Sequence, residues 1–573
     1  MPLPLSRPLR PVALALLLGA ASALTPPVAQ AQGVAGAFLA AREAGVANDF
    51  AASLPYLERL HAADPQDAGT LEGLVVGAFS VGAFDLAAQN ARDLAALDPD
   101  SRAAAMVLLT ESFRAEDYAS VLTIAGSGVR VHPLVDGLAQ AWAHLGAGRM
   151  SEAQQAFDTV SQIDGMRAFA LYCRSLALAL VGDVEGAAAV LENPDDGVSS
   201  ALNRRGYIAY AQILGLTERF DDALTLLDTV FPGATDPLIA RMHEAYAAHQ
   251  ALPFDVIASP AQGMAEVFSV MSNAMRSAQN PHEALIYAQA AVRVNPALTD
   301  AQLLIGQVFE DLHQPQLAVA AYSAIPDGDP FGMAARMGRA QVLESLDRLD
   351  EAVADLRQLV DENPGSYAAQ NVLGDFLRRD GQFPAAVEAY TSAIDLLRAS
   401  GHEPDWQTLF ALAVALSRSD RWDEAEAGFR AALAQQPDQP TVLNYLGYSL
   451  IERGEKYDEA LDMIERAVQG DPDSGYILDS LAWALFRLGR YSEALPHMER
   501  SVELAPTDAV LNDHLGDVFW AVGRLREARF QWRRALSFAP ADDLEEARLR
   551  RKLEVGLDAV RAEAGEPPLH PDN

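Results

Sequence analysis

Residues 475–508 read GYILDSLAWALFRLGRYSEALPHMERSVELAPTD, and residues 509–542 read AVLNDHLGDVFWAVGRLREARFQWRRALSFAPAD. The two stretches align without a gap and share a small residue at position 8, an alanine at position 20 and a proline at position 32. The same frame recurs upstream, in units that begin at residues 265, 299, 333, 367, 406, 440, 475 and 509. A period of 34 residues predicts stacked structural units instead of separate globular domains.

The positions within each unit predict a pair of helices. Positions 8 and 11 lie three residues apart and share one helix face, where a small residue admits a second helix and a large one fills the space beside it. In seven of the eight units a proline at position 32 ends the second helix, and a turn such as Leu488-Gly489-Arg490 separates the two helices. Each helix is about 13 residues long and too short to be stable alone in water. The sequence therefore predicts an all-α fold, an α-solenoid of stacked helical hairpins.

Two positions carry this prediction in every unit. Position 8 is always small: Ser272, Gly306, Ala340, Gly374, Ala413, Gly447, Ala482 and Gly516. Position 20, after one inserted residue in the unit at 440, is always alanine: Ala284, Ala318, Ala352, Ala386, Ala425, Ala460, Ala494 and Ala528. We expect the two positions to touch across each hairpin, for example at Gly447 and Ala460.

These residues, with an aromatic or apolar residue at position 24 (Tyr322, Tyr390, Phe429, Trp532), resemble the tetratricopeptide repeat (TPR) family. The resemblance implies a right-handed superhelix whose first helices line a concave wall. Looser units begin at residues 68, 134, 168 and 204, and starts near 34 and 102 are weaker. The last stretch, with apolar residues at helical spacing, predicts a capping helix at the end of the stack.

The domain organisation follows from these units. We predict a signal peptide (1–31), an N-terminal degenerate TPR-like array (32–230), a proline-rich irregular joint (231–264), a C-terminal array of eight repeats (265–542), a capping helix (543–564) and a flexible tail (565–573).

The first 31 residues have the pattern of a secretory signal. Arg7 and Arg10 precede an apolar run from Val12 to Leu24, and Ala29-Gln30-Ala31 forms a small-x-small cleavage site. We therefore predict a periplasmic protein whose mature chain begins at Gln32. The run is too short for a transmembrane helix, and no cysteine is present near the cleavage site for a lipid anchor.

The composition restricts the functional classes. Hydrophobic residues make up 50% of the chain, which supports a large core. The formal net charge is −36, from 43 Lys and Arg against 79 Asp and Glu, so the surface repels a phosphate backbone and we expect no nucleic-acid partner. The single cysteine, Cys173, excludes an intramolecular disulfide and a Cys-ligated metal cluster.

Candidate partner-binding residues come from positions 2, 5, 9 and 12 of the first helices, which the TPR resemblance places on the concave wall. In the last three units these positions combine aromatic rings with polar groups, a combination typical of binding surfaces. The candidates are Asn444, Tyr448, Tyr476, Asp479, Trp483, Phe486, Asp513, Asp517 and Trp520. Alternatively, the aromatic residues fill gaps between adjacent hairpins.

The sequence contains no convincing catalytic, cofactor or metal motif. His243 and His249 are six residues apart instead of four, so they do not share a helix face as zinc ligands. Gly454-Glu455-Lys456 lacks the glycine spacing of a phosphate loop, and Gly126-Ser127-Gly128 lacks the frame of a nucleophile elbow. We expect a non-enzymatic protein without cofactor. A hydrolase would need a polar cluster that crosses several repeats.

A narrower resemblance suggests a role. Residues 439–448, 479–483, 512–517 and 529–534 are similar to long TPR proteins exported by Gram-negative bacteria. Some members of that group are outer-membrane lipoproteins that act as adaptors of a periplasmic C-terminal processing protease. The resemblance implies a scaffold for partner proteins or peptides, with a processing protease among them. The alternative is a component of outer-membrane or exported polysaccharide assembly machinery.

Overall fold

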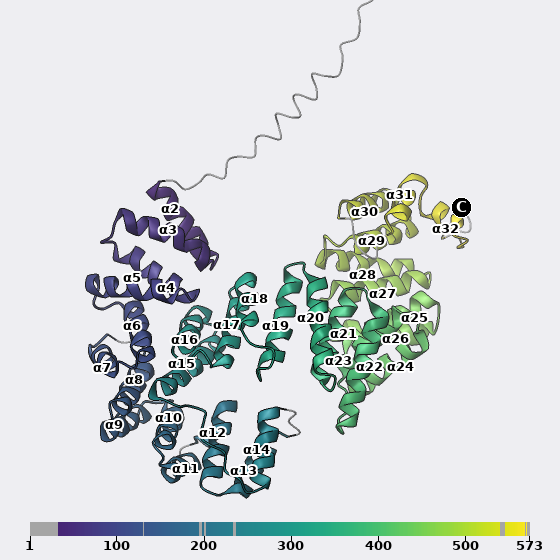
Figure 1. The fold of residues 1–573 in the computed structure, drawn as a ribbon. Helices are drawn as coiled ribbons and strands as arrows, with labels where there is room; N and C mark the ends of the chain where they lie inside the picture. Colours follow the sequence, from purple (N-terminus) through teal and green to yellow (C-terminus); the bar gives the residue numbers. More distant parts are fainter. Residues whose placement is uncertain are drawn as a thin grey trace, which may run out of the picture. The chain divides into compact units, whose positions relative to one another are not determined.

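A computed structural model describes residues 33–129, 131–193, 197–199, 202–232, 236–538, 545–567 and 569. These residues form 31 helices, α2 to α32, and no strand (Figure 1). The predicted all-α solenoid is confirmed. The predicted signal peptide and most of the predicted tail lie outside the described residues. None of the described helices has both the length and the apolar character that a bilayer crossing requires.

The chain divides into two compact units, unit 1 up to Asp355 and unit 2 from Leu356. In unit 1, the first helices of the hairpins are α2 (Val34–Val46), α4 (Ala68–Ser80), α6 (Arg102–Arg114), α8 (Pro133–Gly146), α10 (Arg167–Leu180), α12 (Arg204–Leu216), α15 (Pro260–Ser277), α17 (Thr299–Asp311) and α19 (Gly332–Ser345). The second helices are α3 (Phe50–Ala63), α5 (Phe84–Leu97), α7 (Tyr118–Gly126), α9 (Met150–Ser161), α11 (Val184–Glu192), α13 (Phe220–Val230), α16 (Pro281–Val294), α18 (Pro315–Ser323) and α20 (Leu349–Glu362), which runs across the boundary.

Unit 2 has the same construction. Its hairpins are α21 (Tyr367–Arg379) with α22 (Phe383–Ala399), α23 (Trp406–Ser417) with α24 (Trp422–Gln435), α25 (Pro440–Arg453) with α26 (Tyr457–Gly470), α27 (Gly475–Arg487) with α28 (Tyr491–Leu504), and α29 (Ala509–Ala521) with α30 (Leu525–Ser537). The predicted single capping helix is instead two short helices, α31 (Glu546–Val555) and α32 (Leu557–Glu563). They separate at Gly556, whose φ of +86° is a left-handed conformation that an α-helix cannot continue through.

At least one residue in the left-handed backbone region lies in the turn of each hairpin, and the α25–α26 turn has a second one, Lys456; a further residue of this kind, His249, follows the helix 237–247, which has no second helix. These turn residues repeat with the period of the sequence: Asn48, Gly82, Glu116, Gly148, Gly182, Glu218, His249, Gln279, His313, Asp347, Gly381, Asp420, Gly454, Gly489 and Gly523. Where the residue is not glycine, it is polar, and a short turn tolerates it at a small conformational cost. The hairpin repeat therefore extends through unit 1, well before residue 265.

The contact expected between positions 8 and 20 is confirmed. A Cβ atom added to Gly447 would lie 2.9 Å from the carbonyl oxygen of Ala460. Where position 8 is serine, its hydroxyl uses this proximity: Ser272 Oγ donates a hydrogen bond to the carbonyl oxygen of Ala284 over 2.7 Å. The small residue is therefore required because the two helix backbones approach closely.

The stretch 231–264, predicted to be an irregular joint, contains a helix. Helix α14 (Pro237–Ala247) is the first helix of a further repeat and ends at the turn residue His249. A second helix does not follow, because Pro253 and Pro260 favour an extended backbone in the residues before them. The prolines at 237 and 260 each occupy the first turn of a helix, where no N–H is needed.

The hairpin α15–α16 packs against helices that are far away in the sequence. Helix α15 contacts α6, α8 and α10, and α16 contacts α4 and α6, so the hairpin covers first helices of the preceding repeats (Figure 1). Gln289 Nε2 donates to the carbonyl oxygen of Ser80 over 2.8 Å, and Arg293 pairs with Glu111 over 2.7 Å. One continuous hydrophobic core runs from Leu71 to Ala301. Residues 265–355 therefore belong to the N-terminal unit, and 231–264 is not a boundary between two arrays.

Candidate partner-binding sites

The nine candidate residues lie on α25, α27 and α29 of unit 2, and only some of them are accessible. Tyr476 is 62% exposed, and Asn444, Tyr448 and Trp483 are half-buried. Phe486 is 3% exposed and packs its ring on Trp483, with 4.9 Å between the ring centroids. The expectation of an exposed aromatic row is therefore wrong at Phe486.

Trp520 is also buried, because the C-terminal cap covers it. Its indole Nε1 donates to Asp558 Oδ2 over 2.9 Å, and its ring lies against the backbone of Gly556. Asp479 and Asp517 are buried as well. Phe486 and Trp520 therefore fit the alternative interpretation, in which the aromatic residues fill gaps between adjacent hairpins.

Five of the charged and polar side chains in this region form a C-terminal polar cluster: Asp479, Asp513, His514, Asp517 and Lys552. His514 Nδ1 lies 2.9 Å from Asp479 Oδ1, and the His514 ring stacks on Trp483 with 4.1 Å between centroids. Lys552 Nζ donates to Asp513 Oδ2 and to Asp517 Oδ2, each over 2.8 Å. The cluster joins α27 and α29 to the cap helix α31.

Burial and charge oppose each other in the cluster. Burial disfavours a charged His514, but the carboxylates of Asp479, Asp513 and Asp517 outweigh it and raise the pKa of His514 above its ordinary value. Burial raises the pKa of Asp517, against the nearby ammonium of Lys552. The arrangement fixes the cap on the last repeat and leaves these groups little exposed surface for a partner.

Because the folded state raises the pKa of His514, unit 2 should be most stabilised by this residue at low pH. The contribution is fully present below the unfolded value of about 6.5 and is lost as the pH rises through the folded value. At pH 6 the His514→Gln variant is expected to lose on the order of 1.5–3 kcal/mol, as for a hydrogen bond to a charged group, and less at higher pH. Urea unfolding followed by tryptophan fluorescence measures this, since five of the six tryptophans lie in unit 2.

The control is His402→Gln, at an exposed loop residue whose ring lies beside the Ser400 hydroxyl. An equal loss from His514→Gln at pH 6 and pH 9 would contradict the charge-based account, because a packing defect does not depend on pH.

A groove in unit 1 is a better candidate site. It consists of two adjoining cavities of about 500 and 530 Å³ that share Leu303 and Gln307 of α17. The first cavity is lined by α10, the start of α12, α15 and α17, and the second mainly by α17 and α19. Unlike the C-terminal polar cluster, the groove is open space bordered by several successive first helices.

The groove is lined by the same positions of the first helices that were predicted to face a partner. They belong, however, to the units at 265, 299 and 333 and not to the last three units, where the candidate residues lie. Positions 2, 5, 9 and 12 of the units at 265, 299 and 333 supply most of the lining on α15, α17 and α19: Ser269, Asn273, Arg276, Asp300, Leu303, Gln307, Glu310, Ala334, Met337 and Gln341. Position 9 is a side-chain amide in all three units (Asn273, Gln307, Gln341). That repeated amide was the signal available in the sequence.

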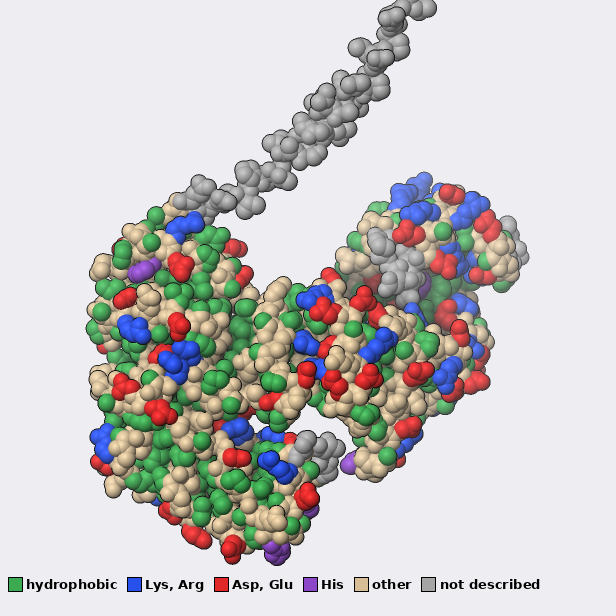
Figure 2. All heavy atoms as spheres, in the orientation of Figure 1, with side chains coloured by type: hydrophobic (Ala, Val, Ile, Leu, Met, Phe, Trp, Pro, Cys, Tyr) green, Lys and Arg blue, Asp and Glu red, His purple; other side chains and the backbone are tan. Residues whose placement is uncertain are grey.

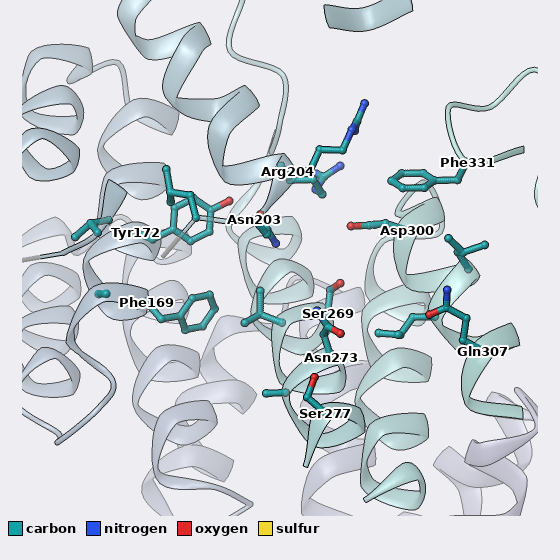
Figure 3. Close-up of a pocket in the computed structure, with 18 residues that line it drawn as sticks. Phe169, Tyr172, Asn203, Arg204, Ser269, Asn273, Ser277, Asp300, Gln307 and Phe331 are labelled. Atoms are coloured by element: carbon teal, nitrogen blue, oxygen red, sulfur yellow. The ribbon is translucent and has the colours of Figure 1, made fainter. Parts of the chain in front are cut away.

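The walls of the first cavity contain charged, amide and aromatic groups (Figure 3). Arg205 pairs with the buried Glu266 over 2.5 Å. Burial raises the pKa of Glu266, and the guanidinium of Arg205 counteracts this. Burial also raises the pKa of Asp300, which makes no ion pair with a described residue. Ser269, Asn273 and Ser277 lie along one face of α15 toward the cavity.

Other kinds of site find less support. Within the described ranges, no group of three or more His, Cys, Asp or Glu side chains is placed to hold a metal ion. Cys173 is buried, and burial raises the pKa of its thiol, which disfavours the reactive thiolate. On the visible face in Figure 2, acidic side chains are mixed with arginines and hydrophobic residues.

A family model described as "Tetratricopeptide repeat" matches residues 271–333, 309–366, 337–404, 410–475 and 453–509. A curated "TPR repeat-containing protein" of Pseudomonas aeruginosa is 28% identical over 192 residues. That match covers 33% of this chain and 31% of the relative, so the chain spans about a third of the length of the curated protein it matches.

Solved structures resemble the chain at low identity. The crystal structure of the APC/C hetero-tetramer Cut9–Hcn1 is 12% identical with a TM-score of 0.37, and the match covers 94% of this chain and 99% of that one. A structure of MamA AMB-1 is 21% identical with a TM-score of 0.25, over 31% of this chain and 94% of that one. MamA from Desulfovibrio magneticus RS-1 has 21% identity and a TM-score of 0.27, over 30% and 96%.

Proposed function

We propose, from the premise that this chain is built of tetratricopeptide repeats, that its unit 1 groove binds extended segments of partner proteins. Tetratricopeptide repeats form scaffolds for protein–protein interaction, and their fold is typically non-enzymatic. A solenoid leaves first-helix side chains accessible along several repeats, a surface suited to a long and narrow ligand.

The observation that carries the proposal is the amide row in the groove. Asn273, Gln307 and Gln341 occupy position 9 of three successive first helices and line the two adjoining cavities. An amide side chain offers both a donor and an acceptor, which matches the N–H and C=O groups of an extended backbone. Asn273 and Gln341 are exposed, and neither has a hydrogen-bond partner among the described residues. Both are therefore available to a ligand.

Selection of random 12-residue peptides on the full chain tests the proposal. Peptides that bind are expected to lose at least about 10-fold in affinity for the triple variant Asn273→Ala, Gln307→Ala, Gln341→Ala, since each lost hydrogen bond costs about 0.5–1.5 kcal/mol. Fluorescence anisotropy with labelled peptides measures the loss.

The matched control removes exposed amides from second helices, Gln89→Ala on α5 and Gln155→Ala on α9, and is expected to bind as the wild type does. Undiminished binding of the selected peptides to the triple variant would refute the groove as the binding site.

We also propose that the protein works in the periplasm and acts as an adaptor of a C-terminal processing protease. The signal-like residues 7–31 support export, and the resemblance to exported Gram-negative TPR proteins supports the adaptor role. Protein recovered from a periplasmic fraction is expected to begin at Gln32. Cross-linking in cells should recover a processing protease and its substrates. Recovery of polysaccharide or outer-membrane assembly enzymes instead would favour the alternative role.

A further inference from the structure

At the end of the first cavity that α12 and α17 form, acidic side chains outnumber basic ones. Arg204 pairs with Asp236, and Arg205 pairs with Glu266 and donates to the carbonyl oxygen of Val256 over 2.9 Å. Asp300 adds a third carboxylate: it accepts a hydrogen bond from the N–H of Ala301 over 2.9 Å, makes no ion pair with a described residue, and is attracted by Arg205 and Arg204 only at longer range. Three carboxylates thus face two guanidiniums, and both guanidiniums are already engaged.

A second group at the same place also lacks a partner. Tyr172 is 4% exposed, and its hydroxyl is buried without a hydrogen-bond partner among the described residues. Burial raises the pKa of Tyr172 well above its ordinary value, so the hydroxyl stays neutral and can accept a hydrogen bond. Figure 3 shows the Tyr172 hydroxyl and the Asp300 carboxylate on opposite sides of the cavity, with Asn203 between them.

We propose that this end of the groove is a pocket for one basic side chain, lysine or arginine, of the bound polypeptide, with Asp300 as its counter-ion. The inference rests on the proposed function and specifies its ligand: a segment that carries a cation at one fixed position. Phe169 and Tyr172 provide aromatic walls, which suit the apolar stem and the charged head of such a side chain, whereas the Phe331 ring already lies under the guanidinium of Arg204, 5.6 Å from its centroid.

A cation suits the pocket better than an anion for two reasons. An incoming carboxylate would have to displace Asp236 or Glu266 from its arginine and would also face the unpaired Asp300. The chain as a whole carries a net charge of −36, which attracts basic segments over longer distances. The pocket therefore adds a local requirement for a cation to a general preference for basic partners.

Ligand-observed NMR on the full chain tests the pocket with N-acetyl-argininamide, N-acetyl-lysinamide and the neutral isostere N-acetyl-citrullinamide. At least one of the two cations is expected to bind at least tenfold more tightly than the citrulline compound, and comparison of the two cations shows which basic residue fits. Asp300→Asn keeps the acceptor for the Ala301 N–H and should weaken cation binding at least tenfold. Cation binding that is unchanged in Asp300→Asn, or equal for the citrulline compound, overturns the proposal.

The matched control is Asp85→Asn. Asp85 is the second residue of its helix, α5, as Asp300 is of α17, but its side chain is 99% exposed and lies outside the groove. This variant should bind the cations as the wild type does, and thermal unfolding of both variants checks that they fold.

Peptide selection separates this proposal from the proposed function. Peptides selected on the wild-type chain whose binding depends on Asn273, Gln307 and Gln341 should be enriched in a basic residue. Peptides selected on the Asp300→Asn variant should not show this enrichment. If such peptides are recovered without a basic residue, the pocket is refuted and the binding function stands. If none is recovered but argininamide or lysinamide binds through Asp300, the pocket stands and the binding function is refuted.

Discussion

Lys552→Met is expected to lower the free energy of unfolding of unit 2 by about 3–5 kcal/mol, because it leaves buried carboxylates without their counter-ion. Lys552 is 2% exposed and donates to both Asp513 and Asp517, while Trp532 Nε1 donates to Asp517 Oδ1 over 2.9 Å. Burial opposes the charge of Lys552, but Asp517 and Asp513 outweigh it and raise its pKa. Urea unfolding followed by tryptophan fluorescence measures the loss.

The chain contains only one other lysine, and it is the natural control. Lys456 pairs with Glu426, but its side chain is 44% exposed, so Lys456→Met is expected to cost only about 0–1 kcal/mol. Adding Asp513→Asn and Asp517→Asn to Lys552→Met removes the uncompensated charges and should recover part of the stability. Similar losses from the two single lysine variants would show that the buried cluster does not behave as a charge-coupled unit.

A fragment of residues 33–232 is expected not to fold, whereas a fragment of residues 33–364 is expected to fold cooperatively. The shorter fragment lacks the α15–α16 hairpin and exposes side chains of α4, α6 and α8 that the hairpin covers. At about 1.5–3 kcal/mol for each large apolar side chain, uncovering several of them costs on the order of 10 kcal/mol, which is comparable with the whole stability of a domain. Circular dichroism melts and size-exclusion chromatography of the two fragments test this.

An ordinary linear solenoid would respond differently to the same truncation. In a linear array each repeat contacts only its neighbours, so removing later repeats would cost one interface and leave a folded, shorter array. A monomeric 33–232 fragment that melts as cooperatively as the longer one would therefore contradict the packing of α15–α16 described above. Co-expression of residues 33–232 with residues 250–364 should restore folding, because the hairpin then covers the same surface from a separate chain.

The candidate site was only partly predictable. The positions that face the groove could be derived from the repeat frame, and they line the cavities on α15, α17 and α19. Which repeats expose these positions could not be derived from the frame, because exposure depends on what packs over each helix. Trp520 was selected as an aromatic residue at such a position, but the cap helix α32 covers it. Nothing in the periodicity distinguishes a covered first helix from an open one.

The sequence by itself determined the repeating unit: the helical hairpin, its turn residue and the small residue at position 8. These features depend on contacts within a hairpin and between neighbouring hairpins, so they recur with the period and can be read from it. The tertiary structure alone decided that Gln289 would meet Ser80 and that the groove would open over α15, α17 and α19. The contact of Gln289 with Ser80 joins residues 209 positions apart and occurs once, and the groove depends on which first helices stay uncovered, so neither has a period that could reveal it.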